Sequence, residues 1–440
     1  MTVSDEPAFH GGGRFVSGSS QGNVHPARVT RAAAVGLALL AAVNVLNYFD
    51  RLLITVVAGP VKKAFALSDT QFGLLSGPAF VLVYISTSLV FGWLTDRFNR
   101  RNLMAIVLAV WSVMTLLGGV AQNFAQLAAA RAGVGLGEAG SNPASLSMIS
   151  DYFAPARRGR AVAVFQASGM IGILLTFLVG GWVASTYGWR AVFFIAALPG
   201  LLLSVALLLF VKEPDRRGRE VGQHAVTLGE SLRLLRGNGA YRWVILASGL
   251  AVFGNLGIMQ WLPQFFIRSH HMSLKEIGLF FGPGLACGMI VGMLAGGWMG
   301  DRLGRTSISR SLLLCVGANL LLAPLDFALL WVPSLRLALI LTFFHAALSV
   351  VYAPTLTATM QTVAGPRVRG MAAAIFNFVN GLLGQALFPL LVGIASDAFA
   401  PAHGEDSLRW AITLVIPIYW VATALFVKAA VVTSKSQVES

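Results

Sequence analysis

The stretch GWLTDRFNRR, residues 92–101, decides the fold of this chain. A similar stretch, GWMGDRLGR, recurs at residues 297–305. Each copy ends a long apolar run with an aspartate and several basic residues. A glycine lets helices approach closely, and an aspartate at a helix end can pair with a basic loop or cap a neighbouring helix. The two copies therefore predict two similar halves, each with a contact that forms and breaks at the same side of the molecule.

The repeat extends beyond these two stretches. Residues 67–101 align without gaps to residues 272–306 at a constant offset of 205. A second match relates Arg158–Phe165 to Arg369–Phe376. Two repeats of this length with a site between them are typical of transporters.

Composition excludes a soluble protein. Of the 440 residues, 56% are hydrophobic and 11% are charged, and the mean hydropathy is +0.74, whereas soluble domains carry about 25% charged residues. The apolar runs are also too long and continuous for an outer-membrane barrel. The net charge of +14 comes from basic residues in short loops, which indicates membrane topology and predicts no nucleic-acid partner.

Twelve apolar segments, each near the ~20 residues that a bilayer core requires, predict an all-α membrane protein with two pseudo-symmetric six-helix bundles. The predicted spans are 32–61, 71–94, 102–121, 124–150, 161–186, 190–211, 241–267, 275–299, 308–331, 335–360, 371–397 and 408–430. The predicted division is a flexible cytoplasmic tail at 1–30, an N-terminal bundle at 31–211, a cytoplasmic linker at 212–240, a C-terminal bundle at 241–430 and a cytoplasmic tail at 431–440.

Loop charges and the linker predict the orientation. Most of the 32 lysines and arginines fall in loops on one side, so the positive-inside rule places both termini in the cytoplasm. The arginine- and alanine-rich composition favours a bacterial inner membrane. Within the linker, the capping box Thr227–Glu230 predicts a short amphipathic helix on the membrane surface.

The repeated motif resembles the loop between spans two and three of the major facilitator superfamily and its second-half copy. Further stretches resemble the Spinster family, whose better-known members move lysophospholipids or sphingosine-1-phosphate. These stretches are Asn47–Arg51, Asp96–Arg101, Arg131–Ala139, Asp151–Phe153 and Lys212–Pro214. The Spinster resemblance covers nearly the whole first half, and the second half resembles the superfamily only. A tyrosine-aspartate-arginine in span one and an arginine-to-glutamate pattern in span four also occur in organic-anion:proton symporters.

Four ionisable side chains lie inside the apolar spans: Asp50, Arg51, Arg131 and Glu138. Each alone would cost roughly 2.5–3.5 kcal/mol at the bilayer centre, so we expect them to face a cavity and one another. Arg131 and Glu138 are seven residues apart and share a helix face. We expect Asp50 to be the nearest carboxylate of Arg51.

The four charges sum to zero, so protonating one carboxylate leaves an arginine with one partner fewer. This predicts proton coupling through Glu138 and Asp50. Arg51 and Arg131, together with Asn47 and Tyr48, would act as charge switch or substrate ligands. A permanent structural salt-bridge set is the alternative.

The repeated motif predicts a cytoplasmic gate. Its residues are Gly92, Asp96, Arg97, Arg100, Arg101, Arg160, Asp301, Arg302 and Arg305. The alternative is that these charged residues only set the membrane topology and form no gate.

Glycines at 133, 135 and 137 and at 284, 288, 292 and 296 predict close helix packing. No Walker sequence is present, so we expect no cofactor and no metal, and a proton gradient as the energy source.

The second-half spans carry almost no charge, and a cavity with one charged and one apolar wall suits an amphipathic molecule. We interpret His345 as a hydrogen-bonded packing residue, with a proton relay as the alternative, and Asp326 as reaching the membrane interface.

These features predict a monomeric, proton-coupled secondary active transporter that works by alternating access. Its substrate would be an amphipathic lipid-like anion such as a lysolipid or sphingoid phosphate. A proton symporter for a small organic anion, of the sugar-acid type, is the alternative. A transporter-like sensor is disfavoured because both halves carry gating motifs, and an enzyme is disfavoured because no catalytic constellation is present.

Overall fold

The computed structural model describes residues 30–215, 228–304, 307–365 and 367–438. These residues are helical almost throughout, with no strand among them, so the all-α prediction is confirmed. The tail at 1–29 and residues 216–227 of the linker, including Thr227 of the expected capping box, lie outside the described residues.

The helices of the first half run from α1 to α9. They are α1 (Arg31–Val56), α2 (Ala58–Phe65), α3 (Asp69–Ser76), α4 (Pro78–Arg97), α5 (Arg100–Val120), α6 (Phe124–Glu138), α7 (Ser141–Tyr152), α8 (Pro155–Tyr187) and α9 (Trp189–Phe210).

The linker helix and the second half follow. They are α10 (Leu228–Gly237), α11 (Gly239–Ser269), α12 (Leu274–Glu276), η1 (Ile277–Phe281), α13 (Gly282–Gly304), α14 (Ile308–Trp331), α15 (Leu335–Val351), α16 (Ala353–Ala364), α17 (Arg369–Asn380), η2 (Gly381–Leu387), α18 (Phe388–His403), η3 (Gly404–Asp406), α19 (Ser407–Val415) and α20 (Ile418–Val438).

The described helices make twelve membrane-crossing segments, as the sequence predicts. Ten helical runs are long and apolar enough to cross a bilayer. The pair α6 and α7, interrupted only at residues 139–140, adds one more. The run from Arg369 to Ser434 contains two crossings. The chain turns at the short helix η3, and the helices on either side of it, α18 and α19, pack against each other.

Several spans consist of two helices because proline interrupts the backbone ladder. Pro78 begins α4 directly after the break at Gly77, and Pro354 lies in the first turn of α16 after the break at Tyr352. Proline lacks the N–H that a continuous helix needs, and it is well tolerated in the first turn. The breaks therefore follow from local sequence.

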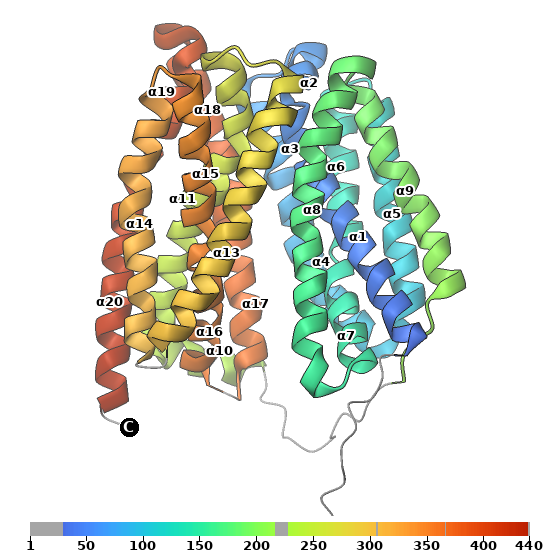
Figure 1. Cartoon of the computed structure of the whole chain (residues 1–440), viewed down its shortest axis with the longest axis vertical. Helices are drawn as coiled ribbons and strands as arrows, with labels where there is room; N and C mark the ends of the chain where they lie inside the picture. Colours follow the sequence, from blue (N-terminus) through green and yellow to red (C-terminus); the bar gives the residue numbers. More distant parts are fainter. Residues whose placement is uncertain (1–29, 216–227, 305–306, 366, 439–440) are drawn as a thin grey trace, which may run out of the picture.

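The helices form two bundles, α1 to α9 and α11 to α20, that stand side by side and meet closely near α2 and α3 (Figure 1). We call this the α2/α3 end, and the opposite end, where α10 and the C-terminus lie, the linker end (Figure 1). Helix α3 packs on α18, and α8 packs on η1 and α13.

Repeated glycines make these contacts possible. A Cβ atom added to Gly73 would lie 2.3 Å from the carbonyl oxygen of Pro389 in α18, and one added to Gly278 would lie 2.7 Å from that of Phe177 in α8. Gly73 and Gly278 are equivalent residues of the repeat. The serines that begin the two copies, Ser68 and Ser273, both form capping boxes. The internal repeat is thus visible as two matching contacts between the bundles.

The glycine ladder of span eight also packs as predicted, except at its first member. Cβ atoms added to Gly288, Gly292 and Gly296 would lie 2.4, 2.1 and 1.7 Å from backbone oxygens of α15, whereas Gly284 has nothing within 4 Å. Helices α13 and α15 are therefore in backbone contact over three turns.

Candidate functional site

The four predicted charges come together between two helices of the N-terminal bundle. Asp50 and Arg51 lie on α1, and Arg131 and Glu138 lie on α6. Asp50, Arg131 and Glu138 are buried, with relative exposures of 3%, 2% and 1%. The side chain of Arg51 keeps 21% exposure. The expectation that all four face a cavity is therefore wrong for three of them, because the helices close over these side chains.

Arg51 pairs with Glu138. Its Nη2 lies 3.1 Å and its Nε 3.4 Å from Glu138 Oε2. The guanidinium also lies among three aromatic rings, 4.8 Å from the centroid of Tyr84, 5.4 Å from Phe80 and 5.8 Å from Tyr48. Arg51 is thus held by one charge and by ring faces, which attract cations.

The second carboxylate has a different partner from the one expected. Asp50 Oδ2 accepts a hydrogen bond from the hydroxyl of Thr115 in α5. Arg131 donates to the backbone oxygens of Asp50 and Arg51, at 3.2 and 3.4 Å, and its guanidinium lies 5.0 Å from the Phe80 ring centroid. The expectation that Asp50 is the nearest carboxylate of Arg51 is wrong, because successive residues on a helix point in different directions.

Each buried carboxylate keeps one oxygen without a hydrogen-bond partner among the described residues, Oδ1 of Asp50 and Oε1 of Glu138. A proton can bind at such an oxygen without first displacing the contact on the other. The arrangement is therefore chemically suited to taking up a proton. Asn47 is buried and Tyr48 is half-buried on the same helix.

The predicted gate residues divide into a buried anchor and an exposed surface. Arg100 is 2% exposed and binds Asp151 at the end of α7 and Glu213 after α9, the latter at 2.7 Å. The backbone N–H of Arg101 donates to Glu213 as well. This network ties the motif to its own bundle, and the motif alone did not reveal its acidic partners.

The exposed gate residues lie at the linker end of the helices. Asp96, Arg97, Arg160, Asp301 and Arg302 are exposed, Gly92 has no atom within 4 Å of an added Cβ, and Arg305 lies outside the described residues. The two halves match here too, since Arg97 lies 4.1 Å from the Trp93 ring centroid and Arg302 lies 4.4 Å from that of Trp298.

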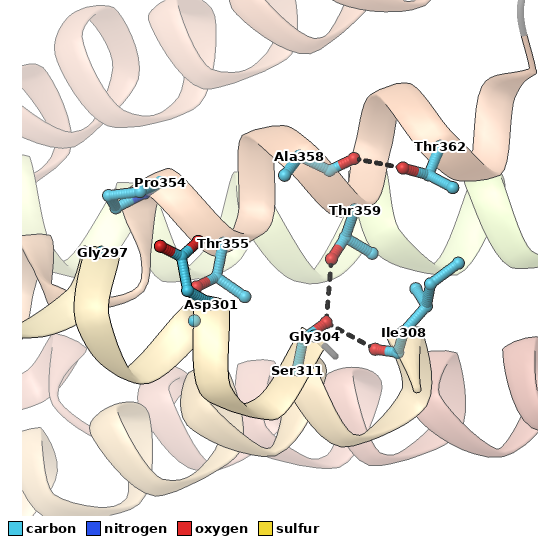
Figure 2. Close-up of a pocket in the computed structure, with 11 residues that line it drawn as sticks. Gly297, Asp301, Gly304, Ile308, Ser311, Pro354, Thr355, Ala358, Thr359 and Thr362 are labelled. Carbon is cyan, nitrogen blue, oxygen red and sulfur yellow. Dashed lines mark hydrogen bonds between the residues drawn. The ribbon is translucent and has the colours of Figure 1, made fainter. Parts of the chain in front are cut away.

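Asp301 lines a cavity of about 560 Å³ between α13, α14 and α16 (Figure 2). Thr355 lies beside it, and Ser311 and Thr359 bond to each other 3.2 Å apart (Figure 2). A second, apolar groove of about 260 Å³ lies between α8 and the start of the eighth span, with Lys275 in its lining.

Sequence reasoning missed an ion cluster at the α2/α3 end, which we call the outer latch: Lys62, Asp69, Arg268, Ser396 and Asp397. Asp69, which is 4% exposed, binds Arg268 and Ser396 of the other bundle and Lys62 of its own. Asp397 accepts from the backbone N–H groups of Asp69 and Thr70, at 2.9 and 2.8 Å, and so caps α3 from the opposite bundle. The sequence signal that could have revealed this cluster is the presence of ionisable residues at the ends of predicted spans.

The interpretation of Asp326 is also corrected. It is 1% exposed and does not reach the interface, because it binds His345 of the neighbouring helix at 2.6 Å. The interpretation of His345 as a hydrogen-bonded residue agrees with this contact.

The chain is similar in sequence to known proteins. The profile of the Major Facilitator Superfamily matches residues 40–389. An MFS-type efflux pump of Mycolicibacterium smegmatis is 31% identical, over 90% of this chain and 93% of its own. The sphingosine-1-phosphate transporter SPNS2 of Danio rerio is 26% identical, over 90% of this chain and 85% of its own.

A solved structure agrees at the level of the whole chain. It is described as a bacterial homolog of the human lysosomal transporter Spinster in an inward-facing, unoccupied conformation. It has a TM-score of 0.82 and 25% identity, and the match covers 92% of this chain and 98% of that one.

Proposed function

The chain belongs to the major facilitator superfamily of membrane transporters and is Spinster-like, and we propose that it couples proton movement to transport of an amphipathic, lipid-like anion. The observation that carries this proposal is the buried pair of Glu138 and Arg51. A carboxylate at this depth is expensive to keep ionised without its partner. Protonation of Glu138 and release of Arg51 are therefore linked events.

Release of Arg51 provides the coupling step. When Glu138 takes up a proton, Arg51 loses its negative partner but stays among the rings of Tyr48, Phe80 and Tyr84. Its partly exposed guanidinium can then bind an anionic head group through charge-assisted hydrogen bonds. Asp50 and Arg131 are the second pair of the site, with Asp50 as a further proton acceptor and Arg131 holding α1 through backbone oxygens.

Alternating access requires one end to close while the other opens. The outer latch closes the α2/α3 end through contacts between Asp69, Arg268 and Asp397. The exposed gate residues at the linker end, Asp96 and Asp301 among them, would form the opposite closure. The two sets lie at opposite ends of the helices that carry them, so one can be made while the other is broken.

Two features support a lipid-like anion as substrate. Arg51 combines a positive charge with aromatic rings, which suits a ligand with a charged head and an apolar body. The relative SPNS2 is described as a transporter of sphingosine-1-phosphate, a ligand of this type. The apolar groove with Lys275 in its lining offers such a molecule a place to enter from the bilayer.

The membrane setting completes the proposal. We place the linker end, both tails and α10 in the cytoplasm, following the positive-inside rule, and the protein as a monomer in a bacterial inner membrane. The two bundles at 31–211 and 241–430 then move as units about their glycine contacts, with residues 212–240 connecting them.

The proton step is tested by Glu138→Gln in proteoliposomes. The variant should lose uptake driven by a pH gradient while equilibrium exchange of the same substrate continues, because exchange needs no net proton movement. Glu405→Gln, at an exposed carboxylate, is the matched control. Parent-like accumulation by Glu138→Gln on a pH gradient would show that Glu138 is not the coupling residue.

The substrate class is tested by a binding series at fixed head group. Affinity of lysophospholipids and sphingoid phosphates should rise with chain length, by up to about 0.8 kcal/mol per buried CH₂, until the site is filled. Arg51→Gln should weaken anionic ligands more than uncharged ones. Saturable binding of a sugar acid, with no dependence on chain length, would favour the small-anion symporter instead.

A further inference from the structure

The C-terminal bundle buries a cluster of titratable side chains far from the site described above. Asp326 on α14, His345 on α15 and Tyr419 on α20 are 1%, 0% and 0% exposed. His345 Nδ1 lies 2.6 Å from Asp326 Oδ1, and the Tyr419 hydroxyl donates to Asp326 Oδ2 at 2.9 Å. Three helices thus meet at one carboxylate.

The charge of this cluster depends on a single proton. His345 is the basic partner of Asp326 among the described ion pairs. With an imidazolium and a carboxylate the pair is neutral, and with a neutral imidazole it carries one negative charge. A buried unpaired charge is costly, so gain or loss of this proton changes the energy of the buried cluster.

One atom of the cluster remains available for exchange of that proton. His345 Nε2 is buried and has no hydrogen-bond partner among the described residues. A proton can leave or join at Nε2 while Nδ1 stays bonded to Asp326. The hydrogen bond that joins α14 and α15 therefore survives the change of charge.

The elements packed around the cluster contribute few other ionisable groups. Tyr352, between α15 and α16, is the ionisable neighbour of Tyr419 and is itself bonded to Asn255 of α11. Cys315 of α14 lies near Tyr352. On α19, Arg409 pairs with Asp406 at 3.3 Å. On α13, Gly288 packs against Ala346, beside His345.

The cluster also touches the helix that faces the other bundle. A Cβ added to Gly254 of α11 would lie 2.6 Å from the ring of Tyr419. Helix α11 packs on α1, which carries Asp50 and Arg51. A change of charge at Asp326 and His345 can thus reach the interface between the bundles through Tyr419.

We propose that Asp326, His345 and Tyr419 form a second proton-binding site, located in the C-terminal bundle and independent of Glu138. The two bundles are alike in this respect. The third span is α5 in the first half and α14 in the second half. Asp50 bonds to Thr115 of α5, and Asp326 lies on α14, so each bundle has a buried carboxylate at its third span. Its role in transport rests on the proposed proton coupling, whereas its occupation by a proton does not.

The test is nitrogen-15 NMR of purified protein labelled at its seven histidines, with the His345 signal assigned by its loss in His345→Gln. The His345 ring should change from imidazolium to neutral as the pH is raised. Asp326→Asn should abolish that change by removing the negative partner. Ser349→Ala, which removes a buried hydroxyl that donates to the Ala346 carbonyl of its own helix, should leave the titration as in the parent.

Tyr419→Phe keeps both titrating groups and guards against a folding defect of Asp326→Asn. This variant removes one hydrogen bond to the carboxylate and neither titrating group, so its His345 signal should still change with pH. Glu138→Gln should leave the change at His345 as in the parent. A His345 ring that stays in one form as the pH is raised would overturn the second site while leaving proton coupling through Glu138 intact. Conversely, a titrating His345 in a protein whose transport ignores the pH gradient would overturn the proposed function alone.

Discussion

At the scale of single residues, the functional chemistry depends on which charges the fold brings together. Arg51 and Asp50 are adjacent in sequence, yet Arg51 pairs with Glu138 and Asp50 bonds to Thr115. The two carboxylates therefore have separate environments. Glu138 is paired with a partly exposed arginine, and Asp50 accepts a hydrogen bond from a hydroxyl.

Arg51→Gln should lower the thermal stability of the protein. Removing one partner of a buried pair costs roughly 3–5 kcal/mol, because the remaining charge is left buried and unpaired. Protonation of Glu138 removes that charge, so the difference in unfolding temperature between Arg51→Gln and the parent should shrink as the pH falls. Thermal unfolding from pH 5 to 8 measures this.

The control for this change is Arg97→Gln, which removes an exposed arginine that lies over Trp93. Its unfolding temperature should stay close to that of the parent at every pH. A pH-independent defect in Arg51→Gln would mean that the rings, and not Glu138, account for the contribution of Arg51 to stability.

At the scale of elements, glycines control how closely the helices pack. Helix α13 contacts α15 through backbone atoms at Gly288, Gly292 and Gly296, and the bundle contacts depend on Gly73 and Gly278. Membrane helices gain little from burying apolar side chains, so close backbone approach is a main source of their association. The spacing of glycines therefore indicates which helix faces pack closely, just as the charges indicate the site.

Gly296→Ala should destabilise the C-terminal bundle. The added methyl group would lie 1.7 Å from the carbonyl oxygen of Val351, so the helices must separate. Overpacking of this kind costs typically about 1–3 kcal/mol. Gly284→Ala is the matched control on the same ladder, because nothing lies within 4 Å of its added methyl group. Equal unfolding temperatures for the two variants would contradict the tight contact between α13 and α15.

At the scale of the whole molecule, the outer latch and the repeated motif lie at opposite ends of the bundles. The outer latch joins the bundles at the α2/α3 end, where Asp69 binds Arg268 of the opposite bundle. The repeated motif places Asp96 and Asp301 at the linker end. In the proposed alternating access, the outer latch would compete with charge-assisted bonds formed at the linker end, and substitutions would bias this competition in either direction.

Asp69→Asn and Asp96→Asn should shift the conformational equilibrium in opposite directions. Asp69→Asn leaves Lys62 and Arg268 without their carboxylate and should open the α2/α3 end, while Asp96→Asn should favour states open at the linker end. A bias of a few kcal/mol suffices to invert such a population. Spin-label distances between residues 63 and 403 at one end, and 159 and 362 at the other, measure the shift.

The background for these labels replaces Cys287 and Cys315 with serine. Unchanged distances at both ends in both variants would show that neither carboxylate takes part in closure. Parallel shifts of the two variants toward the same state would contradict the opposition between the outer latch and the repeated motif.

The linear sequence was sufficient for the all-α membrane fold, the twelve spans, the internal repeat and the four charges of the N-terminal bundle. Hydrophobic length and loop charge act locally along the chain, and a repeated motif is visible without coordinates. The tertiary structure decided the rest. It paired Arg51 with Glu138, assembled the outer latch from residues such as Asp69 and Arg268 that lie 199 positions apart, and buried Asp326 against His345. These contacts depend on how each helix is rotated about its axis and on where the two bundles touch. No local stretch of residues encodes either of these.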